Sequence, residues 1–555
     1  MKVRLIRVHR LPIRPIAVIA ALAFLSACNP GPKYSRPPAP APTAYKEAPP
    51  QFKEGAGWVV AQPGDDKIRP KWWEMYNDPQ LNALEQQVAI SNQTVIQAEA
   101  NFRAARSLVV EARSQLFPTI GGTGSYTREH FSSNTRAATV TPTGTTAGTS
   151  ATINQYSVAA DVSYTLDLWH RVRNQIAANS ASAQASAADV ATALLTTQAE
   201  LAQDYFEVRA LDAQEGILQD TLKNYGDALK LTTILFKTGI DSDQDVSQAQ
   251  TQLDTATAQA TDLGVARAQY EHAIATLIGK PAATFELPVA PFVPKPPPVP
   301  VGVPSELLQR RPDIAAAERM VASSNALIGY ARGAYYPSLS LSASGGFLSS
   351  AISNWFTWPS RVWSLGPSVS DTLLDFGARR GAVEQAEATY DADVASYRQT
   401  VLSDFQTVED NLASLRILAT EVEQYGTAVQ ASAHYLALAL TRYRTGVDSY
   451  LNVITAQNTL LSNRESQVQV QLRQMTSSVA LIMALGGGWD ASQLPEYEQF
   501  LKHPPKWSPA GAPPGVQPTT VAAPNPPAVP ALPLPGAAPS PFEPPSGSKN
   551  PPQTK

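Results

Sequence analysis

The chain has 555 residues, of which 43% are hydrophobic and 16% charged, and its formal net charge is −4. At about 150 residues per domain this length allows three or four compact units, so core size is not limiting. The single cysteine excludes a disulfide framework and a thiolate metal cluster, and the net negative charge argues against nucleic acid as the main ligand.

The first 27 residues have the pattern of a secretory signal peptide. Five basic residues precede a short apolar run over 16–25, which is too short to span a bilayer. The tetrapeptide Leu-Ser-Ala-Cys ends at Cys28, and small residues directly before a cysteine are typical of a bacterial lipobox. The sequence therefore predicts cleavage before Cys28 and lipidation of its thiol; an ordinary signal with an incidental cysteine is the alternative. No later stretch of about 20 apolar residues occurs, so we expect no transmembrane helix.

The prolines indicate the domain organisation. Of 47 prolines, eight lie in 30–50, eight in 288–304 and eighteen in 504–555. Proline lacks the backbone donor that helices and sheets require, so these segments are expected to be linkers and a tail. The predicted organisation is a signal peptide (1–27), a lipidated N-terminal linker (28–64), a first repeat (65–287), a Pro-rich connector (288–304), a second repeat (305–490), and a C-terminal segment with a disordered Pro-rich tail (491–555).

The two large blocks are copies of one another. Residues 235–253 align with 442–460 at an offset of 207, with eight of 19 positions identical. Upstream, Pro118 aligns with Pro337 at an offset of 219. The first copy therefore carries about 12 extra residues, which we assign to an exposed loop at 132–152.

Each copy predicts the order helix, two strands, long helix, tight turn, helix. The expected helices are 80–116, 173–237 and 243–277 in the first copy and 312–336, 380–444 and 452–486 in the second. A continuous helix of 65 residues is about 100 Å long, so two shorter helices stacked end to end match one long helix. The strands then lie at one end of the helices and the tight turns at the other.

The predicted strands alternate apolar and small polar residues. The pattern is clearest in 156–166, 338–344 and 363–370. A soluble sandwich shows the same period, and so does a membrane barrel with a wet lumen. Four strands cannot close a barrel, and each unsatisfied backbone group at an edge costs on the order of several kcal/mol in lipid. If the strands lie in a membrane, other chains must pair with their edges.

Several ordered segments carry a resemblance to a known family. They include Trp72-Trp73, Asp78-Pro79, Arg311-Pro312-Asp313-Ile314, Tyr443-Arg444-Thr445-Gly446-Val447-Asp448 and Ala484-Leu485-Gly486-Gly487-Gly488-Trp489. Over about 70–490, and in its lipobox, the chain resembles TolC-type outer-membrane efflux channels of the OprM-like (NodT-type) lipoprotein branch of tripartite RND efflux systems. This implies a mainly α fold with a transmembrane β part, in which a duplicated helix–strand–strand–helix–helix repeat forms a trimeric 12-stranded β-barrel on a long periplasmic α-helical barrel.

The resemblance also implies the function and the partners. The expected protein is a passive trimeric conduit in the bacterial outer membrane, lipid-anchored and extending into the periplasm, which exports small molecules such as drugs and toxic compounds. The implied partners are two further copies of the chain, a periplasmic adaptor (membrane fusion) protein, an inner-membrane RND-type pump and outer-membrane lipid, with no nucleic acid. An export channel of a type I protein-secretion system is the alternative. A coiled-coil structural lipoprotein needs sustained heptads without duplicated strand pairs, and the strand pairs disfavour it.

Candidate site residues lie at the two tight turns. The resemblance places Asp448 at the closed periplasmic aperture, although by itself the sequence favours a turn residue, and Asp241 is expected to be only a turn residue. Tyr443 and Arg444 either hold the inner helix pair closed or are solvated residues at a helix end. Glycines at tight turns favour positive φ. The turn residues expected to contact the adaptor are Thr238, Gly239, Thr445 and Gly446.

Three features depart from the family, and no feature indicates an enzyme. His170 follows Trp169 where the family has glycine, and the tail beyond 504 lies outside the family pattern. Asp371 lies in phase with the apolar face of the last strand, which suggests the periplasmic rim of the barrel rather than its lipid belt. The six histidines are scattered without metal-ligand spacing, and no phosphate loop or nucleophile elbow occurs. We therefore expect no catalysis, no metal and no cofactor beyond covalent lipid on Cys28.

Overall fold

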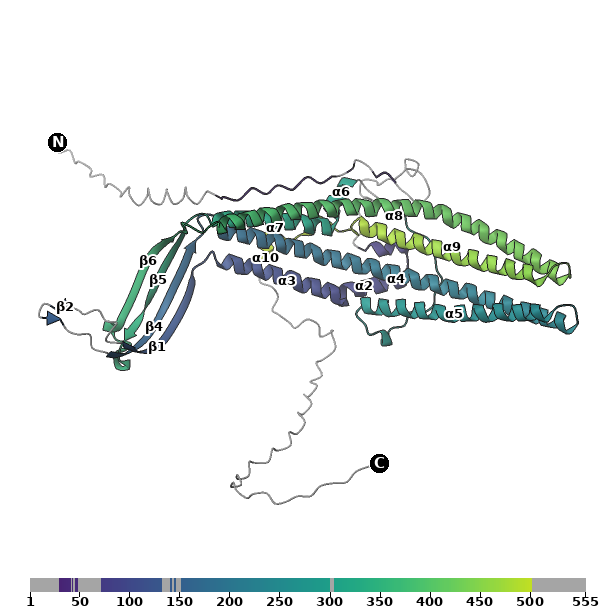
Figure 1. The fold of residues 1–555 in the computed structure, drawn as a ribbon, viewed down its shortest axis with the longest axis horizontal. Coiled ribbons are helices and arrows are strands. Elements are labelled where there is room, and N and C mark those ends of the chain that lie inside the picture. Colours follow the sequence, from purple (N-terminus) through teal and green to yellow (C-terminus); the bar gives the residue numbers. More distant parts are fainter. Residues whose placement is uncertain are drawn as a thin grey trace, which may run out of the picture. The chain divides into compact units, whose positions relative to one another are not determined.

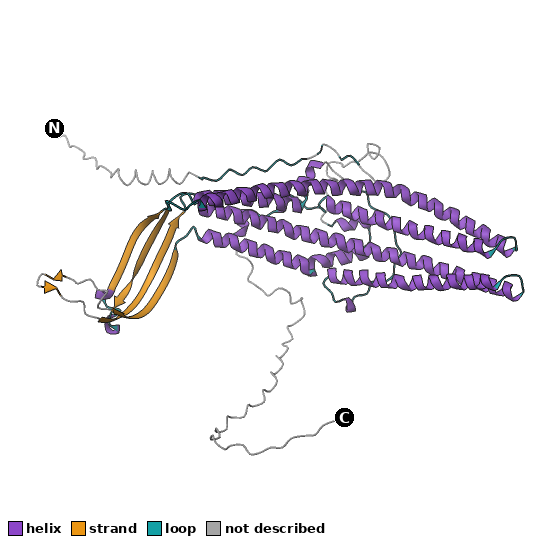
Figure 2. Cartoon of the chain, in the orientation of Figure 1, coloured by secondary structure: helices purple, strands orange, loops and turns teal. Residues whose placement is uncertain are grey.

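The computed structural model describes residues 29–40, 42, 45–47, 71–131, 140–141, 144–145, 151–299 and 304–501. The predicted signal peptide, Cys28, most of the linker, most of the predicted loop 132–152 and everything beyond residue 501 lie outside the described residues. The described elements are mainly long helices together with one four-stranded sheet (Figure 2).

The helices and strands follow the predicted order in both repeats. The helices are α2 (Pro79–Ser91), α3 (Gln93–Ser114), α4 (Arg171–Lys237), α5 (Asp243–Leu277), α6 (Pro304–Arg310), α7 (Pro312–Gly333), α8 (Ala378–Arg444), α9 (Tyr450–Ala484) and α10 (Tyr497–Phe500). The strands are β1 (Thr119–Phe131), β2 (Val140–Thr141), β3 (Gly144–Thr145), β4 (Ala151–Leu166), β5 (Ser338–Ser349) and β6 (Arg361–Ser370). The sheet lies at one end of the helices and the turns α4–α5 and α8–α9 at the opposite end (Figure 1).

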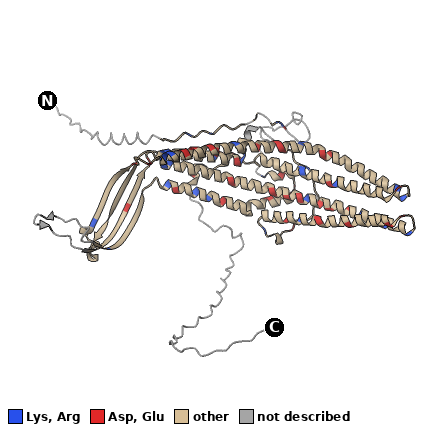
Figure 3. Ribbon diagram, in the orientation of Figure 1, with Lys and Arg blue, Asp and Glu red and all other residues tan. Residues whose placement is uncertain are grey.

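The sheet is antiparallel, in the order β1-β4-β5-β6, and β1 and β6 are its edges. The predicted alternation is confirmed: polar Asp161 pairs with Ser344, which in turn pairs with Ser364. On the other face Trp363 and Leu365 are 74% and 77% exposed. The described strands carry four charged residues, so the sheet is nearly free of charge (Figure 3). No helix in the described part of the chain is both long and apolar enough to cross a bilayer.

The two predicted long helices are confirmed, whereas the predicted helix 80–116 is interrupted. The helices α4 and α8 each span 67 residues. The break at Asn92 divides the first helix into α2 and α3, because its side chain accepts hydrogen bonds from the amides of Thr94 and Val95 and caps α3. The second repeat has the same break at Arg311, between α6 and α7.

Each break is the point where two shorter helices meet end to end. Asn92 donates a hydrogen bond to the carbonyl oxygen of Leu277, at the end of α5, at 2.7 Å. Arg311 donates to the carbonyl oxygen of Ala484, the corresponding residue at the end of α9, at 3.1 Å. The predicted stacking is therefore confirmed: α3 and α5 pack along α4, and α7 and α9 pack along α8.

Glycines allow this close approach. Gly279 and Gly486 have φ of +68° and +91°, in the left-handed region. A Cβ on Gly279 would lie 2.3 Å from the carbonyl oxygen of Ser91, and one on Gly486 would lie 2.1 Å from that of Arg310. Only glycine fits at these two junctions.

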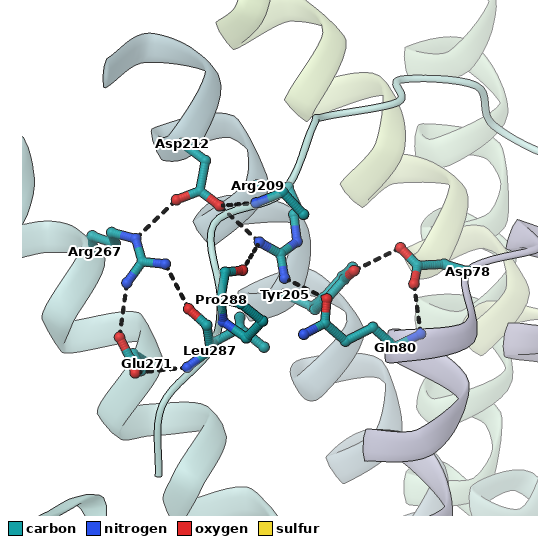
Figure 4. A network of polar contacts seen from close by, with 10 residues as sticks. Asp78, Gln80, Tyr205, Arg209, Asp212, Arg267, Glu271, Leu287 and Pro288 are labelled. Carbon is teal, nitrogen blue, oxygen red and sulfur yellow. Dashed lines mark hydrogen bonds and ion pairs between the residues drawn. The ribbon is translucent and has the colours of Figure 1, made fainter. Parts of the chain in front are cut away.

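A buried polar network fixes the junction of the first repeat to the connector (Figure 4). Arg209, which is 2% exposed, lies 2.7 Å from the carboxylate of Asp212 and donates to the carbonyl oxygen of Pro288 at 2.9 Å. Arg267 lies 2.8 Å from the other oxygen of Asp212 and donates to the carbonyl oxygen of Leu287. Because both arginines bind Asp212 and also donate to carbonyl oxygens of residues 287 and 288, the network orders the start of the Pro-rich connector on α4 and α5.

His170 does not prevent the bend between β4 and α4. It has φ of 56°, and Gly377, at the same position in the second repeat, has φ of 96°. Asp167 accepts hydrogen bonds from the amides of Val172 and Arg173, at 2.9 and 3.0 Å, so it caps α4 after the bend. The departure from the family pattern is therefore accommodated by a histidine in the left-handed region.

Asp371, another departure, directly follows β6, and its Oδ1 lies 3.6 Å from the guanidinium of Arg379.

Candidate functional site at the helix turns

The two tight turns end their helices by the same hydrogen-bond pattern. Gly239 and Gly446 have φ of 78° and 71°. In each turn two successive amides reach back to carbonyl oxygens of the last helical turn: Gly239 to Phe236, Ile240 to Leu235, Gly446 to Tyr443 and Val447 to Arg442. This is the Schellman arrangement, and the left-handed residue it needs explains the Thr-Gly pair in both repeats.

The predicted turn residues lie at the surface. Thr238 and Thr445 use their hydroxyls within their own turn, as donors to carbonyl oxygens of the preceding helical turn. The next residues, Ile240 and Val447, are 68% and 64% exposed. The turns therefore present two small apolar tips, which the rest of the described chain does not cover.

Tyr443, on α8, joins the α8–α9 helix pair to the α4–α5 helix pair. Its side chain is buried between them, and its hydroxyl donates a hydrogen bond to the carboxylate of Asp241 and contacts the hydroxyl of Thr232 at 3.3 Å. Its ring packs on that of Tyr450, with centroids 5.4 Å apart. Burial, followed by the bond to Asp241, raises the pKa of the Tyr443 hydroxyl, so it remains a donor at neutral pH.

The expectation that Asp241 is only a turn residue is wrong. Its carboxylate accepts the hydrogen bond from a helix of the other repeat, 202 residues further along the chain. In the first repeat the position equivalent to Tyr443 is Phe236, which has no hydroxyl and is 43% exposed. The duplicated turns therefore make one link, from the second repeat to the first.

Asp448 is held within its own turn. The Nε of Arg442 lies 3.1 Å from its Oδ2, and its Oδ1 accepts hydrogen bonds from the amide of Ser449 and the side chain of Asn452. The bond from Asn452, and then that from Arg442, lower the pKa of Asp448, so the carboxylate is charged at neutral pH. Arg444 is exposed, and no hydrogen bond or ion pair joins it to another described residue. The geometry thus brings Tyr443 and Asp241 together, and Asp448 and Arg442 together, while Arg444 stands apart.

A second polar contact between the helix pairs was missed by sequence reasoning. Tyr225 donates to the amide oxygen of Asn458 at 3.2 Å, and Gln252 donates to the Tyr225 hydroxyl at 3.1 Å. These residues come from α4, α9 and α5. Their positions in the other repeat carry different residues, so the duplicated pattern gave no signal.

Small residues let the helix pairs approach beside these contacts. The buried cluster around Tyr443 and Tyr450 contains Ala228, Ala249, Ala439, Val453 and Ala456. Small side chains allow close helix contact, although each buries little area. Partly buried leucines such as Leu231 and Leu440 pack against this cluster, so apolar packing and the polar links together hold the pairs.

Cys28 itself lies outside the described residues, and the chain is described from Asn29 onward. The side-chain oxygen of Asn29 accepts a hydrogen bond from Asn174 at 3.1 Å, near the start of α4. Tyr34 contacts Glu318 on α7, and Arg36 donates to the Tyr397 hydroxyl on α8 at 3.3 Å. The N-terminal segment (residues 29–40) therefore lies along the helices, with its first residue at the strand end.

Comparisons with known proteins agree on one family. The chain matches the family described as outer membrane efflux protein over residues 84–280 and 303–487. It is 32% identical over 478 residues to the probable efflux pump outer membrane protein TtgC of Pseudomonas putida, covering 85% of this chain and 95% of that protein. It is 28% identical over 485 residues to the pyoverdine export outer membrane protein OpmQ of Pseudomonas aeruginosa, covering 87% and 98%.

Solved structures give the same result. The outer-membrane channel OprN superposes with a TM-score of 0.74 at 28% identity, covering 83% of this chain and all of that one. The open state of the MtrE outer membrane channel of Neisseria gonorrhoeae superposes with a TM-score of 0.69 at 26% identity, covering 84% and 99%. The chain therefore belongs to the outer membrane efflux protein family. It has the TolC-like fold and is an outer-membrane component of an efflux system.

Proposed function

We propose that this outer membrane efflux protein is a passive trimeric conduit, in which three chains share one barrel. The observation that carries the proposal is the four-stranded sheet with two unpaired edges, β1 and β6, and an exposed apolar face. In lipid these edges must be paired, and β6 of one chain meeting β1 of the next satisfies both. Three chains then supply twelve strands, and their helices continue as one tunnel into the periplasm.

The turns are the proposed periplasmic end of this tunnel. The Tyr443–Asp241 link holds the α8–α9 pair against the α4–α5 pair, and three copies of Asp448 surround the axis. Three carboxylates facing one opening favour cations, and the Arg442 partner of each one limits that preference. Arg444 adds positive charge nearby, without a bond that closes the tunnel.

Docking of a periplasmic adaptor at the turns is proposed to open this end. The exposed Thr238-Gly239 and Thr445-Gly446 turns repeat one shape in each chain, and each carries an apolar tip. An adaptor that binds the splayed arrangement more tightly shifts the population towards the open state. The energy for export comes from an inner-membrane RND-type pump, because nothing in a passive tunnel supplies it.

Lipidation of Cys28 is proposed to anchor the chain in the outer membrane. The lipobox supports it, and so does the place of Asn29 beside the strand end of α4. A lipid attached to the preceding residue starts near the membrane-facing sheet.

Small molecules are the proposed cargo. The relatives are named as outer membrane components of efflux pumps, and one as a pyoverdine export protein. This favours efflux over the alternative, type I secretion of a protein. Deleting the gene should raise sensitivity to small toxic compounds, and the intact gene should restore resistance. Unchanged sensitivity together with loss of a secreted protein would instead support the type I alternative.

A further inference from the structure

A cleft of about 460 Å³ lies where the strand ends of α7, α8 and α4 meet. Its walls include Leu327 and Ala331 from α7, Ala334 directly after that helix, and Ala378 and Ala382 from α8. We propose that this cleft binds small amphiphilic anions, such as aromatic carboxylates, as a site on their way through the tunnel. The inference deepens the proposed function and rests on it for the luminal side of the cleft.

The charge of the cleft fits an anion. Its lining residues include two arginines, Arg171 and Arg379, and no aspartate or glutamate. Arg379 is already held by Asp375 at 2.6 Å and by Asp371 at 3.6 Å. Its charge is therefore largely compensated before any ligand arrives.

Arg171 has no such compensation. Its guanidinium lies over the ring of Tyr330, 4.6 Å from the centroid, and donates to the Tyr330 hydroxyl at 3.2 Å. No carboxylate among the described residues forms an ion pair with it. A cation oriented by an aromatic ring, with donors left over, is suited to bind a carboxylate or sulfonate.

The rest of the cleft fits an apolar body. The alanines on α7 and α8 leave space between the helices, and Leu327 supplies an apolar wall. A ligand with an anionic end at Arg171 therefore places its ring or alkyl chain against apolar side chains. Small-molecule sites commonly combine such a mainly apolar lining with a few polar groups.

The cleft opens on the face of α7 opposite the N-terminal segment. That segment contacts α7 at Glu318 and Asn325, through Tyr34 and Pro32. At 100° per residue, the lining residues Leu327 and Tyr330 lie about 160° and about 140° around α7 from Asn325. A segment that follows a lipid-bearing residue runs outside the tunnel, so the opposite face, with the cleft, faces the lumen.

Fluorine NMR of para-trifluoromethylbenzoate tests the site on the full chain in phosphatidylcholine nanodiscs. We expect saturable line broadening with the wild type and about tenfold weaker binding with Arg171→Gln, because a charge-assisted bond is lost. Arg171→Lys should recover part of the affinity. Arg173→Gln removes a neighbouring cation that does not line the cleft, so it is the matched control and should bind as the wild type.

Three results would overturn the proposal. The first is equal binding of the benzoate by wild type and Arg171→Gln, and the second is equal binding of the neutral para-trifluoromethylbenzamide by the wild type. The third is loss of benzoate binding when phosphatidylglycerol replaces part of the lipid, which would assign the cleft to a lipid headgroup. This measurement needs no ion flow or pump, so it can fail while planar-bilayer conductance still supports the conduit, and the reverse.

Discussion

The hydroxyl of Tyr443 on α8 donates a hydrogen bond to Asp241, in the turn between α4 and α5. The equivalent of Asp241 in the second repeat is Asp448. It is bound instead by Arg442, from the end of the helix that leads into its own turn. Two aspartates at duplicated positions therefore have different partners: Asp241 binds a side chain of the other helix pair, and Asp448 binds a side chain beside its own turn. The difference follows from Tyr443 and Arg442, which replace Phe236 and Leu235 of the first repeat.

Removing the link should loosen the turns. A hydrogen bond to a charged acceptor contributes about 1.5–3 kcal/mol, so we expect Tyr443→Phe to lower the local opening free energy by an amount in that range. Faster amide hydrogen exchange at both turns is the expected readout. Tyr435→Phe alters an exposed tyrosine of the same helix and should leave the exchange unchanged. Identical exchange in both variants would show that packing alone holds the pairs.

The charge of the turn should set ion selectivity. Arg442→Gln removes the partner of Asp448, so three less compensated carboxylates should raise cation preference. Asp448→Ala should lower it. Reversal potentials in planar bilayers under a salt gradient measure both, with Arg380→Gln at the opposite end of α8 as control. Wild-type selectivity in both turn variants would make Asp448 a turn residue only.

Lipidation should affect anchoring more than assembly. We expect Cys28→Ser to lower the fraction retained in outer membranes while the solubilised assembly keeps its mass, because in the proposed trimer the edge strands pair without the lipid. Mass spectrometry of the mature wild-type N-terminus checks the modification directly. An unmodified terminus at another residue would rule it out.

A side chain at the junction of helices should be destabilising. Gly486→Ala puts a Cβ 2.1 Å from the carbonyl oxygen of Arg310 and keeps φ at +91°. Strain of this kind is about 1–3 kcal/mol, so the melting midpoint should fall. Gly381→Ala, in an exposed stretch of α8 with nothing near its Cβ, should not lower it. An unchanged midpoint in Gly486→Ala would mean that the junction is looser than described.

Protonation of Asp204, in the middle of α4, should stabilise the folded protein. Burial, together with Glu200 and Glu207, raises the pKa of Asp204 to about 7. The folded state then binds more protons than the unfolded state between about pH 4 and 7, so stability falls as the pH rises through this window. Asp204→Asn should raise the melting midpoint at pH 8, change it little at pH 5, and thus flatten the pH profile. Asp227→Asn, at an exposed site of α4, should keep the wild-type profile. A profile of wild-type slope in Asp204→Asn would contradict the assignment.

The sequence was sufficient to predict features that repeat or alternate. The bounds of α5 and the ends of α4 and α8 follow from helix formers that stop at a Thr-Gly turn. The break at Asn92 could not be predicted from the sequence, because helix formers continue on both sides of it. The carbonyl oxygen of Leu277, far along the chain, helps to fix the break. The Tyr443–Asp241 link spans 202 residues, and no local pattern predicts which side chain fills a distant gap. A residue-by-residue comparison of the two repeats does give a signal, because Tyr443 aligns with Phe236 of the first repeat.

The central claim, one barrel shared by three chains, is tested most directly by cysteine cross-linking between β1 and β6. A set of paired cysteines along these two edge strands, in the full chain, samples the possible registers. We predict that some pairs form disulfides in outer membranes and that the cross-linked ladder ends at three chains. Cysteine pairs on the central strands β4 and β5 should link only within one chain. Absence of any cross-link between chains, or a ladder that ends at another number, would contradict the shared barrel.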